Sequence, residues 1–426
     1  MKYSYEEVIH IIQNTRRFGN LTGFEVSKRM LEQLGNPQCG IPFVHVAGTN
    51  GKGSTTAFLC KILEQTGKKV GMFTSPHLIT FEERIRINGT YIPKEDVTRL
   101  GNLLLEMEFD VSPTMFDYCL AMAVLYFKEQ ACDIMVMETG IGGRFDSTNA
   151  LGVPELAIIT KIGLDHMAVL GDTLEEIACE KAGIIKADRP VVVHNQELSV
   201  LEVFQKEAAN VGAARMYITS EEAYHLVSGI PMRMVGAYQV ENAATATLAA
   251  RVLFAKWVED GRIHATGAQQ EAFIRAGIAD TFWKGRMEIV NEQPFFMIDG
   301  AHNSHGVRAL KRSLEELYPN EKFHFIMGVM ADKDYEEMIE TLLPLAIDFV
   351  TVTPESNRAL QSEELAECIQ KKGVPARYAE HMEDVIGPLL RGEVEATDKT
   401  IAFGSLYFIG AIEAMLDENS QYNYLP

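Results

Sequence analysis

The chain has 426 residues, more than a single hydrophobic core usually serves, so we expect two domains, each large enough to bury a core of its own. Its 39 Lys and Arg residues stand against 59 Asp and Glu residues, and the formal charge of −20 at pH 7 excludes broad binding to nucleic acids or anionic membranes. The six cysteines include no C-x-x-C pair and no apolar run approaches the roughly 18 residues of a membrane span, which predicts a cytoplasmic protein without a disulfide framework or a zinc site.

The first strong element in chain order is a strand, a glycine-rich turn and the start of a helix. The apolar run Phe43–Ala47 is followed by the heptapeptide Gly48-Thr-Asn-Gly-Lys-Gly-Ser54 and then by a helical pattern. Glycines let the backbone approach phosphate oxygens, N–H groups at a helix start attract negative charge, and Lys52 adds a cation. The pattern predicts a site for a nucleoside triphosphate. It departs from the generic P-loop, because a glycine separates the lysine from the serine. This departure makes the pattern more specific than a generic P-loop motif.

Strand-length apolar segments alternate with helix-length periodic segments along the whole chain. This alternation predicts an α/β protein in which helices cover both faces of parallel sheets. The predicted strands of the first part comprise residues 43–47, 70–73, 134–137, 156–160 and 191–193. Those of the second part comprise residues 295–298, 323–327, 349–352 and 401–403. The polar stretch 291–294 predicts a boundary between a domain of residues 1–292 and a domain of residues 293–426.

Polar side chains follow several predicted strands, at the edge of a parallel sheet where ligands gather. Glu138 ends the third predicted strand and is a candidate magnesium ligand, although a strand-end acid in solvent is the plain alternative. Ser75 follows the second strand and could offer a hydroxyl to a cation or a phosphate, or stand in a simple turn. His166 comes after the fourth strand and could ligate a metal, or be a satisfied structural histidine.

Further candidates rest on weaker signals. Lys181 lies in a helix whose start is predicted by a capping box of Thr173 and Glu176, and by default it is a solvated lysine. Asp299 and His302 follow the first strand of the second part, where they could meet a nucleotide or belong to a glycine-rich turn without a ligand. An anionic small substrate would need local cations, and the clustered candidates are Arg16, Arg17, Arg84, Arg86 and Arg144.

Seven ordered motifs together resemble the folylpolyglutamate synthase family, within the larger group of Mur-type ligases that join an acid to an amino acid using ATP. They occupy residues 45–55, 74–78, 138–149, 164–166, 180–184, 285–288 and 299–303, so the resemblance spans nearly the whole chain. It implies a P-loop, Mur-ligase-type ATP-binding domain and a second, smaller, Rossmann-like α/β domain. It also implies an enzyme of folate biosynthesis and one-carbon metabolism.

The resemblance assigns roles to individual residues. The residues that hold the phosphates of ATP are Gly48, Thr49, Asn50, Gly51, Lys52, Gly53 and Ser54. The positions that match further contacts to ATP are Asn242, Arg286 and Asp299. The matches to ligands of Mg²⁺ are Ser75, Glu138 and His166. Lys181 matches a lysine that such enzymes carry as a carbamate, an anionic oxygen ligand, and it is counted as catalytic together with Lys52 and His302.

Two segments match the pterin-side site of bifunctional members, which also add the first glutamate to dihydropteroate. Their residues are Thr114, Met115, Phe116, Asp117, Phe145, Asp146 and Ser147. Asp117 replaces the glutamate expected of such members. The resemblance implies a bifunctional enzyme. Because Asp117 departs from the pattern of such members, a monofunctional folylpolyglutamate synthase stays as the alternative.

The chemistry implied by the resemblance transfers the γ-phosphoryl group of ATP to a carboxylate, and the amine of L-glutamate then attacks the acyl phosphate. The expected partners are small molecules, namely ATP, L-glutamate and folate or dihydropteroate, and we expect a monomer. A cell-wall Mur ligase is a weaker alternative, because such enzymes carry a nucleotide-sugar domain before the P-loop and 47 residues precede Gly48 here. A non-catalytic ATP-dependent switch would explain the P-loop but not Arg286, Asp299 and His302.

Overall fold

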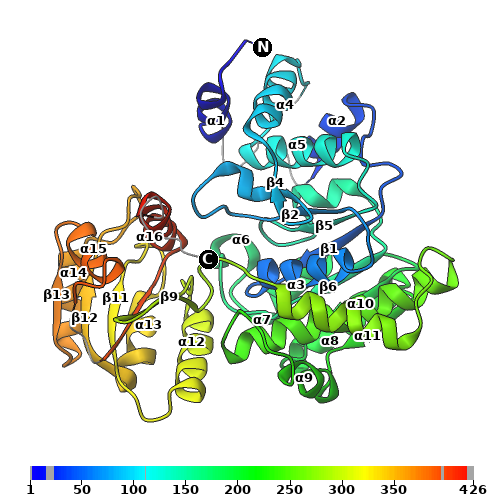
Figure 1. Ribbon diagram of the computed structural model, residues 1–426. Coiled ribbons are helices and arrows are strands. Elements are labelled where there is room, and N and C mark those ends of the chain that lie inside the picture. The colour runs from blue at the N-terminus through cyan, green and yellow to red at the C-terminus, as the bar shows by residue number, and fades with distance from the viewer. Residues whose placement is uncertain (1, 16–23, 111, 395–397, 420–426) are drawn as a thin grey trace. The chain divides into compact units, whose positions relative to one another are not determined.

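The computed structural model describes residues 2–15, 24–110, 112–394 and 398–419, and Figure 1 labels those helices and strands for which it has room. Contacts divide the chain into two compact units. Unit 1 comprises Met1–Arg233 and Val240–Thr281, and unit 2 comprises Met234–Gln239 and Phe282–Pro426. The domain boundary expected between residues 292 and 293 stays a prediction. Two of the candidate cations, Arg16 and Arg17, lie outside the described residues.

Unit 1 is built on an eight-stranded sheet in the order β4-β3-β2-β5-β1-β6-β7-β8. Its strands are β1 (Phe43–Ala47), β2 (Val70–Phe73), β3 (Ile85–Ile87), β4 (Thr90–Tyr91), β5 (Ile134–Glu138), β6 (Leu156–Ile159), β7 (Pro190–Val193) and β8 (Arg215–Ile218). Six neighbouring strands run parallel, namely β2, β5, β1, β6, β7 and β8, while β3 and β4 form an antiparallel edge. All residues of β1 are buried, as expected for a central strand of a parallel sheet.

Helices pack against this sheet. They are α1 (Tyr5–Gln13), α2 (Glu25–Gln33), α3 (Lys52–Glu64), α4 (Lys94–Glu106), α5 (Met115–Glu129), α6 (Met167–Leu170), α7 (Leu174–Ala182), α8 (Leu198–Val211), α9 (Glu221–Ser228), α10 (Ala237–Glu259) and α11 (Gly267–Asp280), with the 3-10 helices η1 (Phe81–Arg84) and η2 (Ser147–Leu151). One apolar cluster joins β1, β2 and β5 to α1, α4 and α5, and another joins β1, β6 and β7 to α7 and α8. The predicted capping box of Thr173 and Glu176 is confirmed at the start of α7.

Unit 2 is built on a six-stranded sheet in the order β13-β12-β11-β14-β10-β9, with β9 antiparallel to β10 and the other pairs parallel. Its strands are β9 (Glu288–Glu292), β10 (Phe295–Ile298), β11 (Phe323–Met327), β12 (Ala346–Thr351), β13 (Ala376–Tyr378) and β14 (Lys399–Phe403). Its helices are α12 (Ser304–Leu317), α13 (Tyr335–Leu342), η3 (Leu343–Leu345), α14 (Ser362–Lys371), α15 (Glu383–Leu390) and α16 (Leu406–Asn419). Two successive residues of β10, Met297 and Ile298, point to opposite faces of the sheet and belong to different apolar clusters, so both faces of the sheet are covered.

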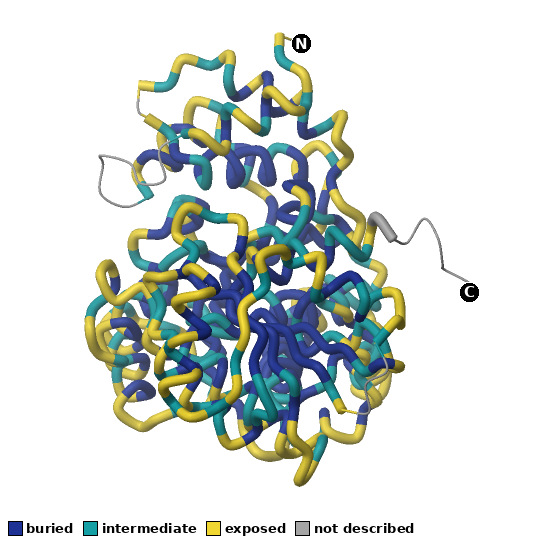
Figure 2. Tube along the Cα trace, turned by 90° about the vertical axis from the view of Figure 1, so that its left-hand side faces the viewer, coloured by how far each residue is buried: buried dark blue, intermediate teal, exposed yellow. Residues whose placement is uncertain are grey.

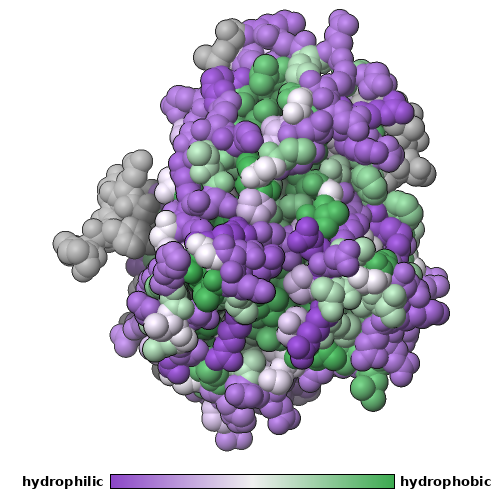
Figure 3. Space-filling view, turned by 90° about the vertical axis from the view of Figure 1, so that its right-hand side faces the viewer, coloured by the Kyte–Doolittle hydropathy of each residue, from purple (hydrophilic) through white to green (hydrophobic). Residues whose placement is uncertain are grey.

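The two sheets with their helices confirm the predicted α/β class. In Figure 2, buried segments, drawn dark blue, gather in the interior, and exposed residues, drawn yellow, lie outside them. On the face drawn in Figure 3, hydrophilic side chains predominate and apolar ones form smaller groups between them. Within the described ranges, no helix combines the length and apolar character needed to cross a membrane.

Candidate nucleotide and acceptor site

A glycine-rich turn joins β1 to α3. Gly51 has a left-handed backbone with φ of 85°, and α3 begins at Lys52, so the first N–H groups of the helix have no partner within it. The N–H groups of Thr49 and Asn50 donate to the carbonyl oxygen of Lys161 over 3.0 and 3.2 Å. The turn is thus tied to the segment after β6, and the helix start beside it favours an anion.

Two glycines of the turn are required by close packing. A Cβ atom at Gly48 would lie 1.8 Å from Oγ1 of Thr160, and one at Gly51 would lie 2.2 Å from Oδ1 of Asn242. The buried Thr160 also donates a hydrogen bond from Oγ1 to the carbonyl oxygen of Asn50 over 2.8 Å. A side chain at either glycine would therefore displace the turn or the groups that hold it.

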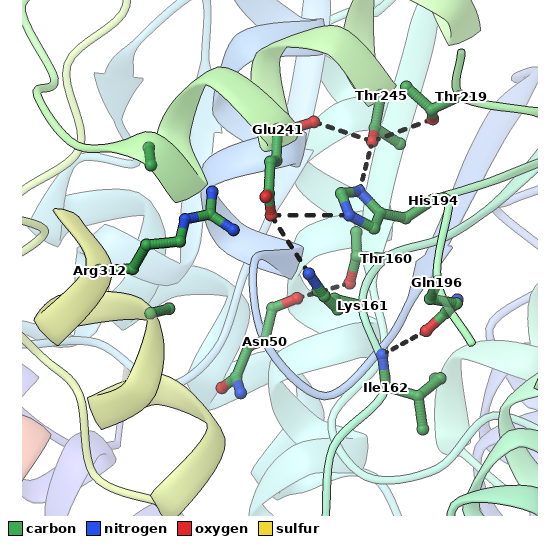
Figure 4. Close-up of polar contacts among 12 residues, drawn as sticks. Asn50, Thr160, Lys161, Ile162, His194, Gln196, Thr219, Glu241, Thr245 and Arg312 are labelled. Carbon is green, nitrogen blue, oxygen red and sulfur yellow. Dashed lines mark hydrogen bonds and ion pairs between the residues drawn. The ribbon is translucent and has the colours of Figure 1, made fainter. Parts of the chain in front are cut away.

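A polar network continues from the turn to α10 (Figure 4). Nζ of Lys161 lies 3.5 Å from Oε2 of Glu241. The same carboxylate oxygen lies 3.7 Å from Nε2 of His194, whose Nδ1 lies 3.0 Å from Oγ1 of Thr245. His194 is buried and directly follows β7. The network therefore joins the carboxyl ends of β6 and β7 to α10, close to the backbone that anchors the turn.

Three predicted residues meet beside the turn. Glu138 is buried at the end of β5, and its Oε2 accepts a hydrogen bond from the N–H of Ser75 over 3.2 Å. Nζ of Lys52 lies 3.9 Å from Oε1 of Glu138 and donates to the carbonyl oxygen of Thr49 over 3.2 Å. A cation, a carboxylate and the serine segment therefore surround one point at the carboxyl ends of the strands. The alternative that Glu138 is a solvent-exposed acid is wrong.

His166 occupies a different kind of position. It is exposed, has a left-handed backbone with φ of 51° and directly precedes α6. Its N–H donates to Oδ1 of Asp165 over 2.9 Å. Across the described part of the chain, no group of three His, Cys, Asp or Glu side chains is arranged to hold a metal ion. A metal here would therefore depend on hydroxyl, phosphate and water oxygens as well as on Glu138.

Lys181 is buried in α7, so its default interpretation as a solvated lysine is wrong. Its Nζ donates to the carbonyl oxygen of Gly48 over 2.8 Å. Burial, and then the charge of Lys52, lowers the pKa of Lys181 to about 7. A sizeable fraction of this amine is therefore neutral near pH 7, directly beneath the glycine-rich turn.

In unit 2, the turn after β10 carries three further predicted residues. Asp299 is buried and accepts a hydrogen bond from the hydroxyl of Tyr238 over 2.5 Å, and burial raises the pKa of its carboxyl. A Cβ atom at Gly300 would lie 2.1 Å from Nη1 of Arg286. Nδ1 of His302 lies 2.7 Å from the carbonyl oxygen of Gly300. Unit 2 thus gathers Arg286, Asp299 and His302 around one glycine.

Two buried carboxylates form what we call the acceptor wall: Asp117 in the first turn of α5 and Asp146 at the start of η2. The carboxylate of Asp117 accepts hydrogen bonds from Ser27 Oγ, from Ser147 Oγ over 2.8 Å, and from N–H and Oγ1 of Thr114 over 2.8 and 2.7 Å. Asp146 accepts four more, from the N–H groups of residues 140, 141 and 148 and from a threonine hydroxyl. Burial raises the pKa of Asp146.

Aromatic side chains lie beside this wall. A Cβ atom at Gly140 would lie 3.0 Å from the ring of Phe116 and 3.2 Å from Oδ2 of Asp146. The ring of Phe116 lies 5.6 Å from that of Phe73 and is partly exposed, as is Met115, while Phe145 is 59% exposed. Carboxylates inside and aromatic faces outside are a suitable surface for a flat heterocycle.

Two family models together cover most of the chain. The Mur ligase middle domain matches residues 46–250, and the Mur ligase glutamate ligase domain matches residues 285–406. The dihydrofolate synthase/folylpolyglutamate synthase of Bacillus subtilis is 35% identical over 97% of this chain and 99% of its own length. The chain belongs to the folylpolyglutamate and dihydrofolate synthase family of Mur ligases.

Solved structures share the fold of this Mur ligase. The folylpolyglutamate synthase of Mycobacterium tuberculosis complexed with ADP has a TM-score of 0.84 and 27% identity, covering 96% of this chain and 98% of that one. Escherichia coli FolC in complex with DHPP and ADP has a TM-score of 0.82 and 26% identity, covering 98% and 99%. The predicted Mur-ligase fold and ATP-dependent ligase activity are confirmed. The alternative function, a non-catalytic ATP-dependent switch, is therefore excluded.

Sequence reasoning missed several residues that support the site of this Mur ligase. They are Ser27, Thr160, His194, Tyr238 and Glu241. Thr160 and His194 stand directly after buried strands, a signal that would have singled them out. Ser27 meets its partner across 90 residues of sequence, and no local pattern indicates that contact.

Proposed function

We propose that this Mur ligase joins L-glutamate to folates and to dihydropteroate through an acyl phosphate. A carboxylate is a poor electrophile, and accepting the γ-phosphoryl group of ATP gives it a leaving group that the amine of glutamate can displace. The name of the Bacillus subtilis relative and the ligands of the Escherichia coli enzyme support this choice of substrates. The observation that carries the proposal is the meeting of Lys52, Ser75 and Glu138 beside the glycine-rich turn.

The glycine-rich turn would hold the triphosphate. The N–H groups at the start of α3 and the ammonium of Lys52 would face the β- and γ-phosphates and neutralise charge during phosphoryl transfer. Asn242, whose Oδ1 packs against Gly51, would contact the nucleotide from α10. In unit 2, Arg286 and Asp299 would contact ATP, and the contact to Gly300 would orient the ring of His302 for a catalytic role.

Magnesium is the metal that these residues fit. Mg²⁺ prefers oxygen ligands and is commonly held by one or two carboxylates together with substrate phosphates and water. Glu138 and Ser75 offer such oxygens next to Lys52, and His166 is the third proposed ligand. When bound, the ion would stabilise negative charge on the phosphates of ATP. The buried Glu138 would supply the carboxylate that keeps the ion at the turn.

Lys181 is suited to carry a carbamate. Its amine is partly neutral near pH 7 because it is buried close to Lys52. A neutral amine can add CO₂ to form an N–C bond, with loss of a proton, and yields an anionic carbamate. The reaction would replace a cation beneath Gly48 by oxygen ligands. The partly neutral amine is the feature of the chain that supports this proposal.

The acceptor wall and its aromatic neighbours would hold the pterin. Phe116 and Phe145 would pack against its faces, together with Thr114, Met115 and Ser147. Because Asp117 and Asp146 already accept four hydrogen bonds each, they would shape this site. The cytoplasmic location and the monomeric state stay predictions.

The proposed function is tested by glutamate-dependent ADP release, measured separately with dihydropteroate and tetrahydrofolate. We expect activity with both acceptors, and a loss of at least about 1,000-fold in Lys52→Ala and Glu138→Ala because both remove charge at the transferring phosphoryl group. Far-UV circular dichroism checks that the variants fold. Activity with tetrahydrofolate alone would identify a monofunctional folylpolyglutamate synthase, and retained turnover in folded variants would refute the assigned roles.

A further inference from the structure

Arg84 is a buried cation without a role in the function described above. It ends η1 immediately before β3, and it is only 7% exposed. Its Nε donates to Nδ1 of His77 over 2.8 Å, and no carboxylate of the described residues forms an ion pair with it. Buried arginines are normally paired with an acid, because an uncompensated charge is costly in a protein interior. This arginine therefore lacks a compensating anion.

The surroundings of Arg84 do not supply that anion. Because Nδ1 of His77 accepts the hydrogen bond from Nε of Arg84, His77 presents a lone pair to the guanidinium and no negative charge. The carboxylate of Glu83 accepts hydrogen bonds from three backbone N–H groups of residues 78–80. The carboxylate of Glu82 is buried near the hydroxyl of Tyr5, and it forms no ion pair with the guanidinium.

Arg84 lies near two parts of the proposed site in unit 1. Its carbonyl oxygen accepts a hydrogen bond from the N–H of Thr74, the residue before Ser75, over 3.0 Å. Arg84 also lies near Cys119 of α5: burial raises the pKa of this thiol to about 11, and the nearby charge of Arg84 opposes the rise. Cys119 stands one helical turn after Phe116 on the same face of α5. Through His77 and Thr74 this arginine adjoins the segment that carries Ser75, and through Cys119 it adjoins the helix that carries Phe116.

The terminal nitrogens of Arg84 remain reachable. Several described residues have polar side-chain atoms that are fully enclosed and make no hydrogen bond. No atom of Arg84 is among them. Since its Nη groups make no hydrogen bond to the described residues, they must retain accessible surface. A guanidinium presents parallel N–H donors whose spacing matches the two oxygens of a carboxylate. His77 fixes the direction of this fork through Nε.

We propose that Arg84 binds the carboxylate of the acceptor acid, with His77 as the positioning residue that orients the guanidinium. An acceptor whose pterin lies at Phe116 and whose acid group faces Ser75 would bring its carboxylate past this arginine. The acid would supply the missing anion, and the protein would gain specificity for a pteroyl acid over its uncharged analogues. This inference rests on the proposed function, since it uses the same acceptor.

The test compares Arg84→Gln and Arg84→Lys with Arg99→Gln in the full chain. Arg99 is a control on α4, where its guanidinium is already paired with the carboxylates of Asp96 and Glu129. We expect Arg84→Gln to raise KM for dihydropteroate and tetrahydrofolate about 10- to 100-fold, with less than about a twofold change in KM for ATP. Arg84→Lys should recover part of the loss, and Arg99→Gln should resemble the wild type.

Two further measurements separate binding from a structural role. Wild-type protein should bind dihydropteroate more tightly than its methyl ester in a titration without ATP, and Arg84→Gln should lose this difference. Removing an uncompensated buried charge should leave Tm unchanged or raise it. Failure of Arg84→Gln to fold, equal losses toward ATP and acceptor, or an increase in KM for ATP alone would overturn the inference.

Failure of the proposed ligase function would give a different experimental result from failure of the role proposed for Arg84. Wild-type protein that releases no ADP with glutamate and either acceptor would refute the ligase assignment, and the acid-against-ester titration would still test Arg84. Active wild-type protein that binds acid and ester equally would overturn the role of Arg84 alone.

Discussion

The acceptor wall and the glycine-rich turn differ in how far their buried charges are compensated by contacts within the chain. At the wall, Asp117 and Asp146 each accept four hydrogen bonds from within the chain, so their acceptor capacity is used. At the turn, Lys181 donates to one carbonyl oxygen, and Lys52 stands 3.9 Å from Glu138. A satisfied carboxylate stabilises local structure, whereas a buried and poorly compensated cation costs stability and is suited to meet a charged ligand.

The largest effect on stability is expected at the acceptor wall, where the hydrogen bonds of Asp117 give this residue a structural role. Asp117→Ala would leave the hydroxyls of Ser27, Thr114 and Ser147 without their shared acceptor. We expect the free energy of unfolding to fall by roughly 3 kcal/mol, because buried polar groups that lose their partners carry the full desolvation cost. Urea unfolding followed by circular dichroism measures the change.

Asp110 offers a control for this substitution. It forms an exposed ion pair with Arg29 at 3.2 Å, and exposed pairs of this kind contribute little. Asp110→Ala should therefore change the free energy of unfolding by less than about 1 kcal/mol. An Asp117→Ala protein as stable as Asp110→Ala would contradict the structural role of the wall.

The second effect concerns the buried amine of the turn. Lys181 has a pKa of about 7 in the folded protein and an ordinary value of 10.5, so the unfolded chain binds more protons between these values. Stability therefore rises with pH in this window. Relative to Lys181→Met, the wild type should gain roughly 2 kcal/mol between pH 7 and pH 9. Urea titrations of both proteins in buffer freed of CO₂ measure this difference.

An exposed lysine checks the assignment. Lys371 is 77% exposed in α14, and Lys371→Met should follow the wild type across the same pH range. A wild type and a Lys181→Met protein whose stabilities run parallel with pH would mean that burial does not perturb this amine. Added bicarbonate should stabilise the wild type and leave Lys181→Met unchanged if the amine forms a carbamate.

Local sequence signals predicted the central strands and missed the outer ones. β1 and β5 are buried apolar runs, and their composition alone indicated strands. The strands that were not predicted are β3, β4, β8, β9 and β13. Most of them are short or partly exposed, and they lie at or next to the edges of the sheets. Their formation depends on pairing with a neighbouring strand, which no local hydropathy pattern encodes.

The same distinction applies to the site. Motifs indicated Lys52 and Glu138, because a phosphate-binding turn and a strand-end acid are local patterns. The contacts that hold these groups could not be predicted, because they join distant segments: Thr160 meets Asn50 across 110 residues of sequence. Burial of Lys181 and Arg84 was equally hidden, since a helix lysine and a surface arginine are the ordinary expectation.

The smallest effect is expected at Thr160, which follows β6 and holds the turn from outside. Its hydroxyl, like the carboxylates of the wall, is hydrogen-bonded within the chain. Thr160→Val keeps the shape that fills the space above Gly48 and removes the hydroxyl that holds the carbonyl oxygen of Asn50. One hydrogen bond is worth about 1 kcal/mol, so KM for ATP should rise roughly fivefold to tenfold with little change in Tm. Thr160→Ser keeps the hydroxyl and should restore KM. If the serine variant is as impaired as the valine variant, packing against Gly48 positions the turn, and the hydroxyl does not.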